Sequence, residues 1–399
     1  MKYIVLIGDG MADHPMSELG GKTPLAVSRT PNMDELAKMG ALGTARTIPS
    51  GFQPASDVAN LSILGYDPKR YYTGRGPLEA ADMGITLDSG DVAFRCNLVT
   101  IAEEKMVDYS AGHIASKEAD AIIKDLDKAL GGSKLKFHTG TSYRHLAIFK
   151  DPAIEKDLLE TKCTPPHDIS GQNAMKYLPK GKGADILNRI MDAAKPILEE
   201  HDVNHVRIDL KENPANSIWL WGQGGSCAMP SFKELYGIDG SIISAVNLVN
   251  GIGRLIGLDV IKVPGATGYY DTNFAGKAEY AINSLKKKDF VYVHVEAPDE
   301  ASHNGDMREK MRAIENFDNY IVGGVLKEFK DKGGYRILVL PDHYTPLSIK
   351  THTEEPIPFI MAGDGIEPDS SAVFTEDEAK KGGMKFDRAH ELLGALIKG

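Results

Sequence analysis

Residues 289–303 read DFVYVHVEAPDEASH, and this stretch decides the fold class. A short run rich in β-branched and aromatic residues is typical of a buried strand, and here it leads to Asp299. The same pattern recurs in residues 3–10, YIVLIGDG, and in residues 334–343, GYRILVLPDH. Polar side chains therefore follow three strands at their carboxyl ends, the edge where ligands bind in open parallel sheets.

Helical periods separate these strands, at Pro31–Met39, Gly305–Lys330 and Phe386–Ile397. Strands that alternate with helices favour a parallel sheet covered on both faces. The sequence therefore predicts an α/β protein with a doubly wound, mostly parallel sheet.

A long middle block, 90–275, has strand and helix patterns of its own. Its strand-like stretches are VAFRCNLVTI, KLKFHTG, HLAIFK and SIWLWG, and its helical periods are Ser116–Leu130, Ala184–His201 and Ser241–Leu258. Metal-ligating residue types cluster before and after this block and hardly within it. We therefore expect a discontinuous catalytic domain, 1–89 and 276–399, interrupted by an inserted α/β (α+β) domain at 90–275.

Composition excludes several classes of function. The 399 residues include 46 Lys and Arg against 56 Asp and Glu, a net charge of −10, which disfavours binding to nucleic acid or to an anionic membrane. The three cysteines, Cys96, Cys163 and Cys227, are far apart and odd in number, which favours a reducing compartment. No stretch of eighteen apolar residues and no signal-peptide pattern is found, so we expect a cytoplasmic protein without a membrane span.

The strand ends carry residues of the types that bind metal ions. Asp299 and His303 are four residues apart, which in a helix places both side chains on one face. Asp342 and His343 are adjacent, His352 follows after a short loop, and Asp9 comes from the first strand. Each residue alone could be a helix cap or an ordinary surface residue, but together the six are enough ligands for two divalent ions such as Mn²⁺ or Zn²⁺.

Ser56 is the candidate nucleophile. It precedes an apolar helical period in GFQPASDVANLSILGYDP, so its hydroxyl is expected at a helix N-terminus, where the partial positive charge favours an alkoxide or a phosphate. A coordinated divalent ion would lower the pKa of the hydroxyl further. The alternative is that Ser56 only caps the helix.

These residues and their surroundings resemble the alkaline phosphatase superfamily, and most closely its cofactor-independent phosphoglycerate mutases of the shorter, archaeal type. The segments that carry the resemblance are IGDGMAD, GGKTPL, TPNMDELAKMG, SDVANLSILGYDP, YYTGRGPLEAA, PPHDISG, SIWLWGQG, PGATGYYDTN and PDEASH. They span nearly the whole chain. IGDGMAD and SDVANLSILGYDP are also similar to a bacterial branch proposed as homoserine kinases.

The resemblance implies how the ligands divide between two ions and what Ser56 does. One ion would be held by Asp9, Ser56, Asp342 and His343, and the other by Asp299, His303 and His352. Ser56 would take the phosphoryl group from 3-phosphoglycerate and return it to the 2-hydroxyl, with two divalent ions, Mn²⁺ first among Mn²⁺, Zn²⁺, Mg²⁺ and Co²⁺, and without bisphosphoglycerate as a cofactor. A phosphoserine must be kept from water, which is a physical reason for the inserted domain to act as a substrate-binding lid.

A small phosphorylated carboxylic acid also needs cations around it, and guanidinium groups suit it best. The candidates for substrate binding are Arg75, Arg95, Arg144, Arg254 and Lys262, and His113 is a candidate proton donor or acceptor.

Three other functions compete with the mutase. A homoserine kinase or other metal-dependent phosphotransferase would use the same site, but the sequence has no P-loop or protein-kinase signature for ATP. A phosphatase would result if water reached the phosphoserine. A non-catalytic metal-binding protein would leave Ser56 as a helix cap.

Overall fold

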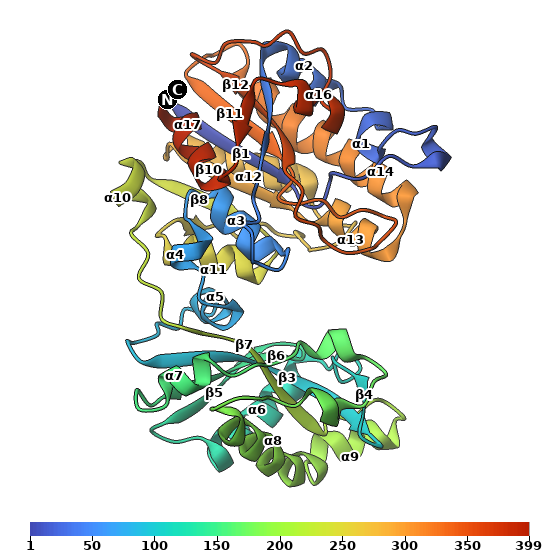
Figure 1. Cartoon of the computed structure of the whole chain (residues 1–399), viewed down its shortest axis with the longest axis vertical. Coiled ribbons are helices and arrows are strands. Elements are labelled where there is room, and N and C mark those ends of the chain that lie inside the picture. Colours follow the sequence, from blue (N-terminus) through green and yellow to red (C-terminus); the bar gives the residue numbers. More distant parts are fainter. Residues whose placement is uncertain (399) are drawn as a thin grey trace. The chain divides into compact units, whose positions relative to one another are not determined.

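The structure, a computed structural model, describes residues 1–398. Its chain divides into two compact units (Figure 1). The first unit comprises 1–72 and 229–399, and the second comprises 73–228. The chain therefore leaves the first unit once and returns to it once.

An eight-stranded sheet forms the centre of the first unit, in the order β13-β2-β12-β11-β1-β10-β8-β9. The strands are β1 (Lys2–Gly8), β2 (Gly40–Ala45), β8 (Gly240–Ile243), β9 (Asp259–Val260), β10 (Phe290–Val295), β11 (Tyr335–Leu340), β12 (Ile357–Gly363) and β13 (Met384–Phe386). The strands β11, β1, β10, β8 and β9 are parallel, whereas β12 is antiparallel to both of its neighbours. The register aligns Ile7 of β1 with His294 of β10 and Leu340 of β11, so these three strands end together.

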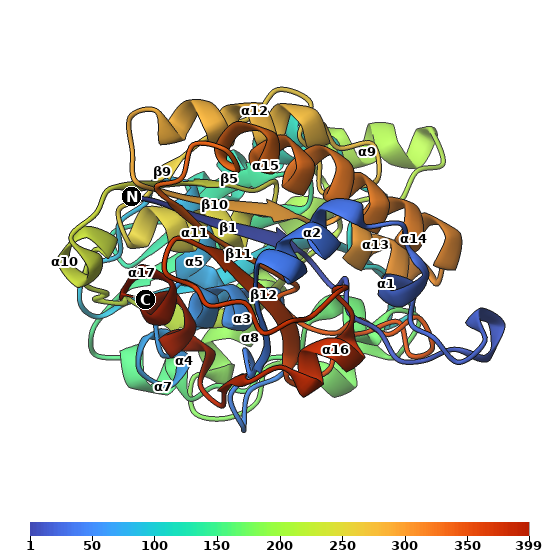
Figure 2. The same cartoon turned by 90° about the horizontal axis from the view of Figure 1, so that it is seen from above.

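Helices cover both faces of this sheet (Figure 2). One group is α2 (Pro31–Met39), α12 (Phe274–Leu285), α14 (Met307–Asn316), the π-helical turn η4 (Phe317–Val322) and α15 (Gly323–Phe329), and the other is α3 (Ser56–Ile63), α11 (Asn247–Leu255) and α17 (Leu392–Lys398). The first group shares one apolar core with the inner strands, which includes Ile4, Val293, Phe317 and Ile337, all without exposed surface. The predicted α/β fold class is confirmed, because parallel strands that are buried on both faces need this helical cover.

The second unit is built on an antiparallel sheet. Its strands are β3 (Asp91–Ala102), β4 (Lys105–Asp108), β5 (Leu135–Thr141), β6 (Arg144–Lys150) and β7 (Ser217–Gly225). The long strand β3 pairs with β6 and β7, and β5 extends the sheet beyond β6. Two helices, α6 (Ser116–Leu130) and α8 (Ala184–Glu199), pack on one face, and α5 (Arg75–Asp82) contacts β3 and β7 (Figure 1).

The boundaries of the units differ from the predicted 90 and 275. Residues 229–275 belong to the first unit, because β8 pairs in parallel with β10 as part of its sheet. The predicted helix at Ser241–Leu258 is wrong at its start, where the chain forms β8 before α11. Residues 73–89 belong to the second unit, because α5 packs on its strands.

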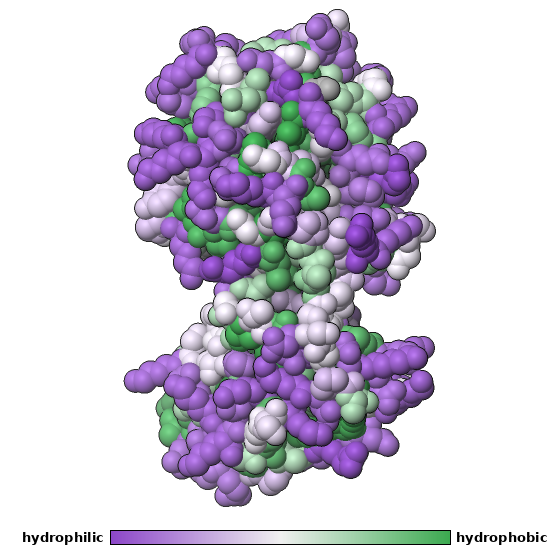
Figure 3. Space-filling model, turned by 90° about the vertical axis from the view of Figure 1, so that its left-hand side faces the viewer, coloured by the Kyte–Doolittle hydropathy of each residue, from purple (hydrophilic) through white to green (hydrophobic). Residues whose placement is uncertain are grey.

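Within the described residues, no helix is both long and apolar enough to cross a lipid bilayer. The face of the molecule seen in Figure 3 carries mainly hydrophilic residues, with hydrophobic ones scattered among them.

Candidate active site

The predicted metal-ligating residues converge at the carboxyl ends of three neighbouring strands. Asp9 follows β1, Asp342 and His343 follow β11, and Asp299 lies in α13 (Ala297–Asn304), the helix that follows β10. These strands are adjacent and parallel, so their ends meet at one edge of the sheet. Helix α13 places His303 one turn after Asp299, and the loop after β11 brings in His352.

Two groups of donor atoms form within this cluster. Asp9, Asp342 and His343 form one, and Asp299, His343 and His352 form the other, with the ligand atoms of each group within 4.8 Å of one another. In the first group, His343 Nε2 lies 3.5 Å from Asp9 Oδ1 and 3.5 Å from Asp342 Oδ2. Five of the six residues that sequence spacing singled out are thus brought together in these two groups.

His303, the sixth residue, lies next to Asp299 and His352 of the second group. Its Nε2 atom lies 3.1 Å from Asp299 Oδ2 and 2.9 Å from His352 Nε2, and His352 Nε2 lies 3.5 Å from Asp299 Oδ1. Two imidazole nitrogens at this separation share at most one proton in the free protein, whereas a cation between them would be bound by both lone pairs.

Ser56 lies beside the first group. It is the first residue of α3, as predicted, and its Oγ atom lies 3.0 Å from His343 Nε2. The side chain of Ser56 makes no capping hydrogen bond at this helix, because Ala55 takes the N-cap position. The hydroxyl is thus free of the capping role and points at the cluster.

The cluster is buried, which raises the electrostatic cost of its charges. Burial, followed by repulsion from Asp342 and Asp299, raises the pKa of Asp9 well above its ordinary value. Burial likewise lowers the pKa of His343 to about 4. For His303, the hydrogen bond with Asp299 outweighs burial and raises the pKa to about 9.

This donor set fits a divalent cation. Asp9 Oδ1 is buried and has no hydrogen-bond partner anywhere in residues 1–398, although it lies among two other carboxylates. A cation would satisfy this atom and turn the repulsion between the carboxylates into attraction. Carboxylate and imidazole ligands without thiolates suit Mn²⁺, Zn²⁺, Co²⁺ or Mg²⁺.

Sequence reasoning missed a second layer of side chains around the cluster. His294 lies in β10 with no exposed surface, and its Nε2 atom is 3.3 Å from Asp9 Oδ2. Asn60 donates to Asp342 Oδ2 at 2.8 Å and accepts from the hydroxyl of Tyr292 at 2.5 Å. These contacts hold the carboxylates in place. The only available signal was polarity inside otherwise apolar runs, since His294 interrupts FVYVHV.

Three of the predicted substrate-binding arginines gather in the second unit. The guanidinium groups of Arg95 and Arg75 lie 4.4 and 5.7 Å from the ring of Trp221, and Arg95 forms a 3.0 Å ion pair with Glu79. Burial lowers the pKa of Arg95, as does repulsion from Arg75 and Arg144. The three cations are therefore close enough to interact, on elements α5, β3 and β6.

The remaining predicted residues lie elsewhere. His113 is an exposed residue of the second unit, and its ring packs 6.1 Å from that of Tyr143, over which Arg144 also lies. Arg254 and Lys262 are exposed residues of the first unit.

Fold and site together define the class of protein: an α/β domain with a serine hydroxyl beside a buried carboxylate–imidazole cluster suited to divalent metal. A family model described as 2,3-bisphosphoglycerate-independent phosphoglycerate mutase matches residues 37–204. The chain is 54% identical to an enzyme of that name from Methanosarcina acetivorans, over the full length of both.

Two solved structures are similar to this chain over nearly its whole length. A protein from Pyrococcus horikoshii is 33% identical, with a TM-score of 0.84 over 99% of this chain and 96% of that one. A cofactor-independent phosphoglycerate mutase from Thermoplasma acidophilum is 28% identical, with a TM-score of 0.68 over 100% and 99%. The chain belongs to the family of 2,3-bisphosphoglycerate-independent phosphoglycerate mutases, as the sequence motifs predicted.

Proposed function

We propose that this protein interconverts 3-phosphoglycerate and 2-phosphoglycerate through a phosphoserine at Ser56. The observation that carries the proposal is the position of the Ser56 hydroxyl, 3.0 Å from His343 and at the first turn of α3. A helix N-terminus favours the negative charge of an alkoxide or a phosphate at this point. The family membership and the relatives' names support the mutase reaction.

In the first half-reaction, the Ser56 oxygen attacks phosphorus, the bond from phosphorus to the 3-oxygen breaks, and the glycerate leaves with a proton on that oxygen. In the second, the 2-hydroxyl of the same glycerate attacks the phosphoserine and Ser56 recovers its proton. No phosphoryl group is gained or lost over the cycle, so no bisphosphoglycerate cofactor is needed. We propose His113 as a group that donates or accepts a proton while the glycerate reorients.

The cluster would hold two divalent ions, with Mn²⁺ as our first choice. The proposed ligands are Asp9, Ser56, Asp342 and His343 for one ion and Asp299, His303 and His352 for the other. Bound ions lower the pKa of a serine hydroxyl and stabilise the oxygens of a phosphoryl group in transfer. His294 and Asn60 would hold the carboxylate ligands in orientation.

The arginine group around Trp221 would bind the substrate's carboxylate and phosphate through Arg75, Arg95 and Arg144, because planar guanidinium groups match both anions. Arg254 and Lys262 stay as further candidates for the same role. The lid function of the second unit and a cytoplasmic location likewise stay predictions.

The test is an enolase-coupled assay with 3-phosphoglycerate and Mn²⁺, run beside homoserine with ATP. We expect 2-phosphoglycerate to form in the first and no ADP in the second. Ser56→Ala should lower kcat by at least about 10³-fold because the covalent route is lost, while the protein still binds Mn²⁺. Ser62→Ala, on the same helix, is the matched control and should stay active. Turnover by Ser56→Ala near the wild-type rate would exclude the covalent mechanism.

A further inference from the structure

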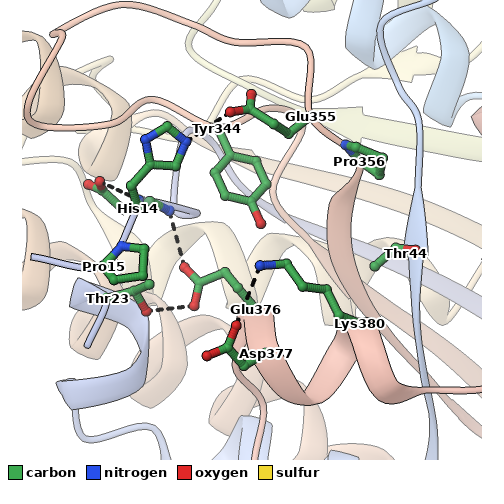
Figure 4. Close-up of a pocket in the computed structure, with 11 residues that line it drawn as sticks. His14, Pro15, Thr23, Thr44, Tyr344, Glu355, Pro356, Glu376, Asp377 and Lys380 are labelled. Atoms are coloured by element: carbon green, nitrogen blue, oxygen red, sulfur yellow. Dashed lines mark hydrogen bonds and ion pairs between the residues drawn. The ribbon is translucent and has the colours of Figure 1, made fainter. Parts of the chain in front are cut away.

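A cavity of about 430 Å³ lies in the first unit, outside the proposed active site (Figure 4). Its walls come from the segments that follow the ligand-bearing residues. His14 and Pro15 come after Asp9 in the chain, Tyr344 comes directly after His343, and Glu355 and Pro356 come shortly after His352. The opposite wall is α16 (Glu376–Lys381). A cavity of this size can hold a small organic molecule.

The charge around this cavity is negative. Glu355, Glu376 and Asp377 line it together with Lys380, which lies 3.4 Å from Asp377, and His14, whose Nε2 atom lies 2.8 Å from Glu355 Oε1. A fourth carboxylate, Asp13, is already neutralised by Lys310 at 2.7 Å. A cationic ligand would therefore be favoured over an anionic one.

Glu376 is the residue that points to a ligand. Glu376 lines the cavity but is only 2% exposed, and Figure 4 shows its carboxylate directed toward Thr23. It accepts hydrogen bonds from the Thr23 hydroxyl and from the backbone N–H of Asp13, both neutral donors. In residues 1–398, no cation forms an ion pair with this carboxylate, and burial raises its pKa although its hydrogen bonds and the charge of Lys310 oppose the shift. A buried carboxylate without a paired cation is unfavourable, and a bound ammonium group would correct this.

The apolar part of the cavity suits the body of such a ligand. Pro15, Pro356 and the ring of Tyr344 supply apolar surface. An aromatic ring next to carboxylates also attracts an organic cation through the negative face of its π system.

Buried hydrogen bonds connect this cavity to the proposed metal ligands. Asp13, whose N–H binds Glu376, accepts from Lys310, and Lys310 donates to the backbone oxygen of Thr345 at 3.0 Å. The Thr345 hydroxyl donates to Asp299 Oδ1 at 2.5 Å and lies 3.1 Å from His343 Nδ1. Four residues thus join the cavity to a ligand of each proposed ion.

We propose that this cavity binds a small organic cation, an ammonium group on a compact apolar body, and that its occupation changes the affinity of the active site for Mn²⁺. Binding places the ammonium group against Glu376, and the body lies against Tyr344 and the prolines. The coupling is reciprocal, so Mn²⁺ changes the affinity for the cation by the same factor. Only the coupling depends on the proposed metal site; the binding itself does not.

The first experiment measures binding of benzylamine to the full-length protein by ligand-observed NMR, with benzyl alcohol and benzoate as neutral and anionic counterparts. We expect benzylamine to bind with a Kd on the order of 1 mM and its counterparts at least about tenfold more weakly. Glu376→Gln should weaken benzylamine at least about tenfold, whereas Glu378→Gln, two residues further along α16 and outside the cavity, should not. Equal binding of benzoate, no binding of benzylamine, or unchanged binding to Glu376→Gln would overturn the site.

A second variant tests the site in case Glu376→Gln does not fold. Thr44→Leu enlarges a side chain of β2 that lines the cavity and keeps all the carboxylates. It should weaken benzylamine binding by taking up part of the cavity, and unchanged binding would overturn this placement of the ligand. The coupling is tested by titrating Mn²⁺ with and without saturating benzylamine, where we expect at least a twofold change in the Kd for Mn²⁺. An unchanged Kd alongside confirmed binding overturns the coupling, and absence of Mn²⁺ binding altogether overturns the metal site and not the cation site.

Discussion

Lys310→Met is predicted to destabilise the first unit strongly. The ammonium group of Lys310 has no exposed surface and donates to Asp13 Oδ2 at 2.7 Å and to the backbone oxygens of Thr345 and Ala12 at 3.0 and 3.4 Å. Its removal leaves the Asp13 carboxylate buried and without a paired cation. Loss of one partner from a buried ion pair costs about 3–5 kcal/mol.

The assay is urea unfolding followed by far-UV circular dichroism. Both tryptophans, Trp219 and Trp221, lie in the second unit, so their emission reports on that unit separately. The double variant Asp13→Asn with Lys310→Met should regain part of the loss, because no charge is left uncompensated. Lys332→Met, which removes an exposed lysine, should change the midpoint little. A Lys310→Met protein within about 1 kcal/mol of wild type would refute this reasoning.

Three further predictions concern metal, pH and substrate. Removal of divalent metal with EDTA should lower Tm, because an ion at 100 times its Kd stabilises the folded state by about 2.7 kcal/mol; a Tm unaffected by EDTA and by added Mn²⁺ would count against the metal site. His145 is buried and its pKa is lowered to about 3, so the folded state binds fewer protons than the unfolded state between pH 3 and 6.5 and stability falls on acidification. Going from pH 6.5 to 4.5 should cost at most about 2.7 kcal/mol by tryptophan emission, and His145→Gln should lose this dependence; equal pH dependence in both proteins would contradict the assignment. Arg144→Lys should raise KM for 3-phosphoglycerate about 10-fold or more with little change in kcat, whereas the exposed Arg189→Lys should leave KM unchanged, and an unaltered KM in Arg144→Lys would remove it from the substrate site.

The sequence predicted the structure best where a local pattern of apolar and polar residues determines the secondary structure. The strands before Asp9, Asp299 and Asp342 are short apolar runs that end in polar residues, and parallel pairing brings such ends together. The helix at Ser56 was predictable for a similar reason, because its apolar period begins directly after that residue.

Features that depend on the pairing of strands far apart in the sequence could not be predicted. Residues 240–243 are apolar enough for a strand or a buried helix. Only their pairing with β10 makes them a strand, and this pairing is why the inserted domain ends earlier in the chain than predicted. His294 was missed because nothing local shows that a histidine within a strand faces Asp9. The group of Arg75, Arg95 and Trp221 likewise depends on the pairing of β3 with β7.

The proposed mutase reaction requires the Ser56 oxygen to carry the phosphoryl group during turnover. The most direct measurement is acid quenching of the Mn²⁺-loaded protein with 3-phosphoglycerate, followed by peptide mass spectrometry of the segment that contains Ser56. We expect a phosphorylated peptide with the group on Ser56, formed equally from 2-phosphoglycerate and missing in Ser56→Ala. An active protein that shows no phosphoserine, or that carries the group on another residue, would rule out Ser56 as the phosphoryl carrier.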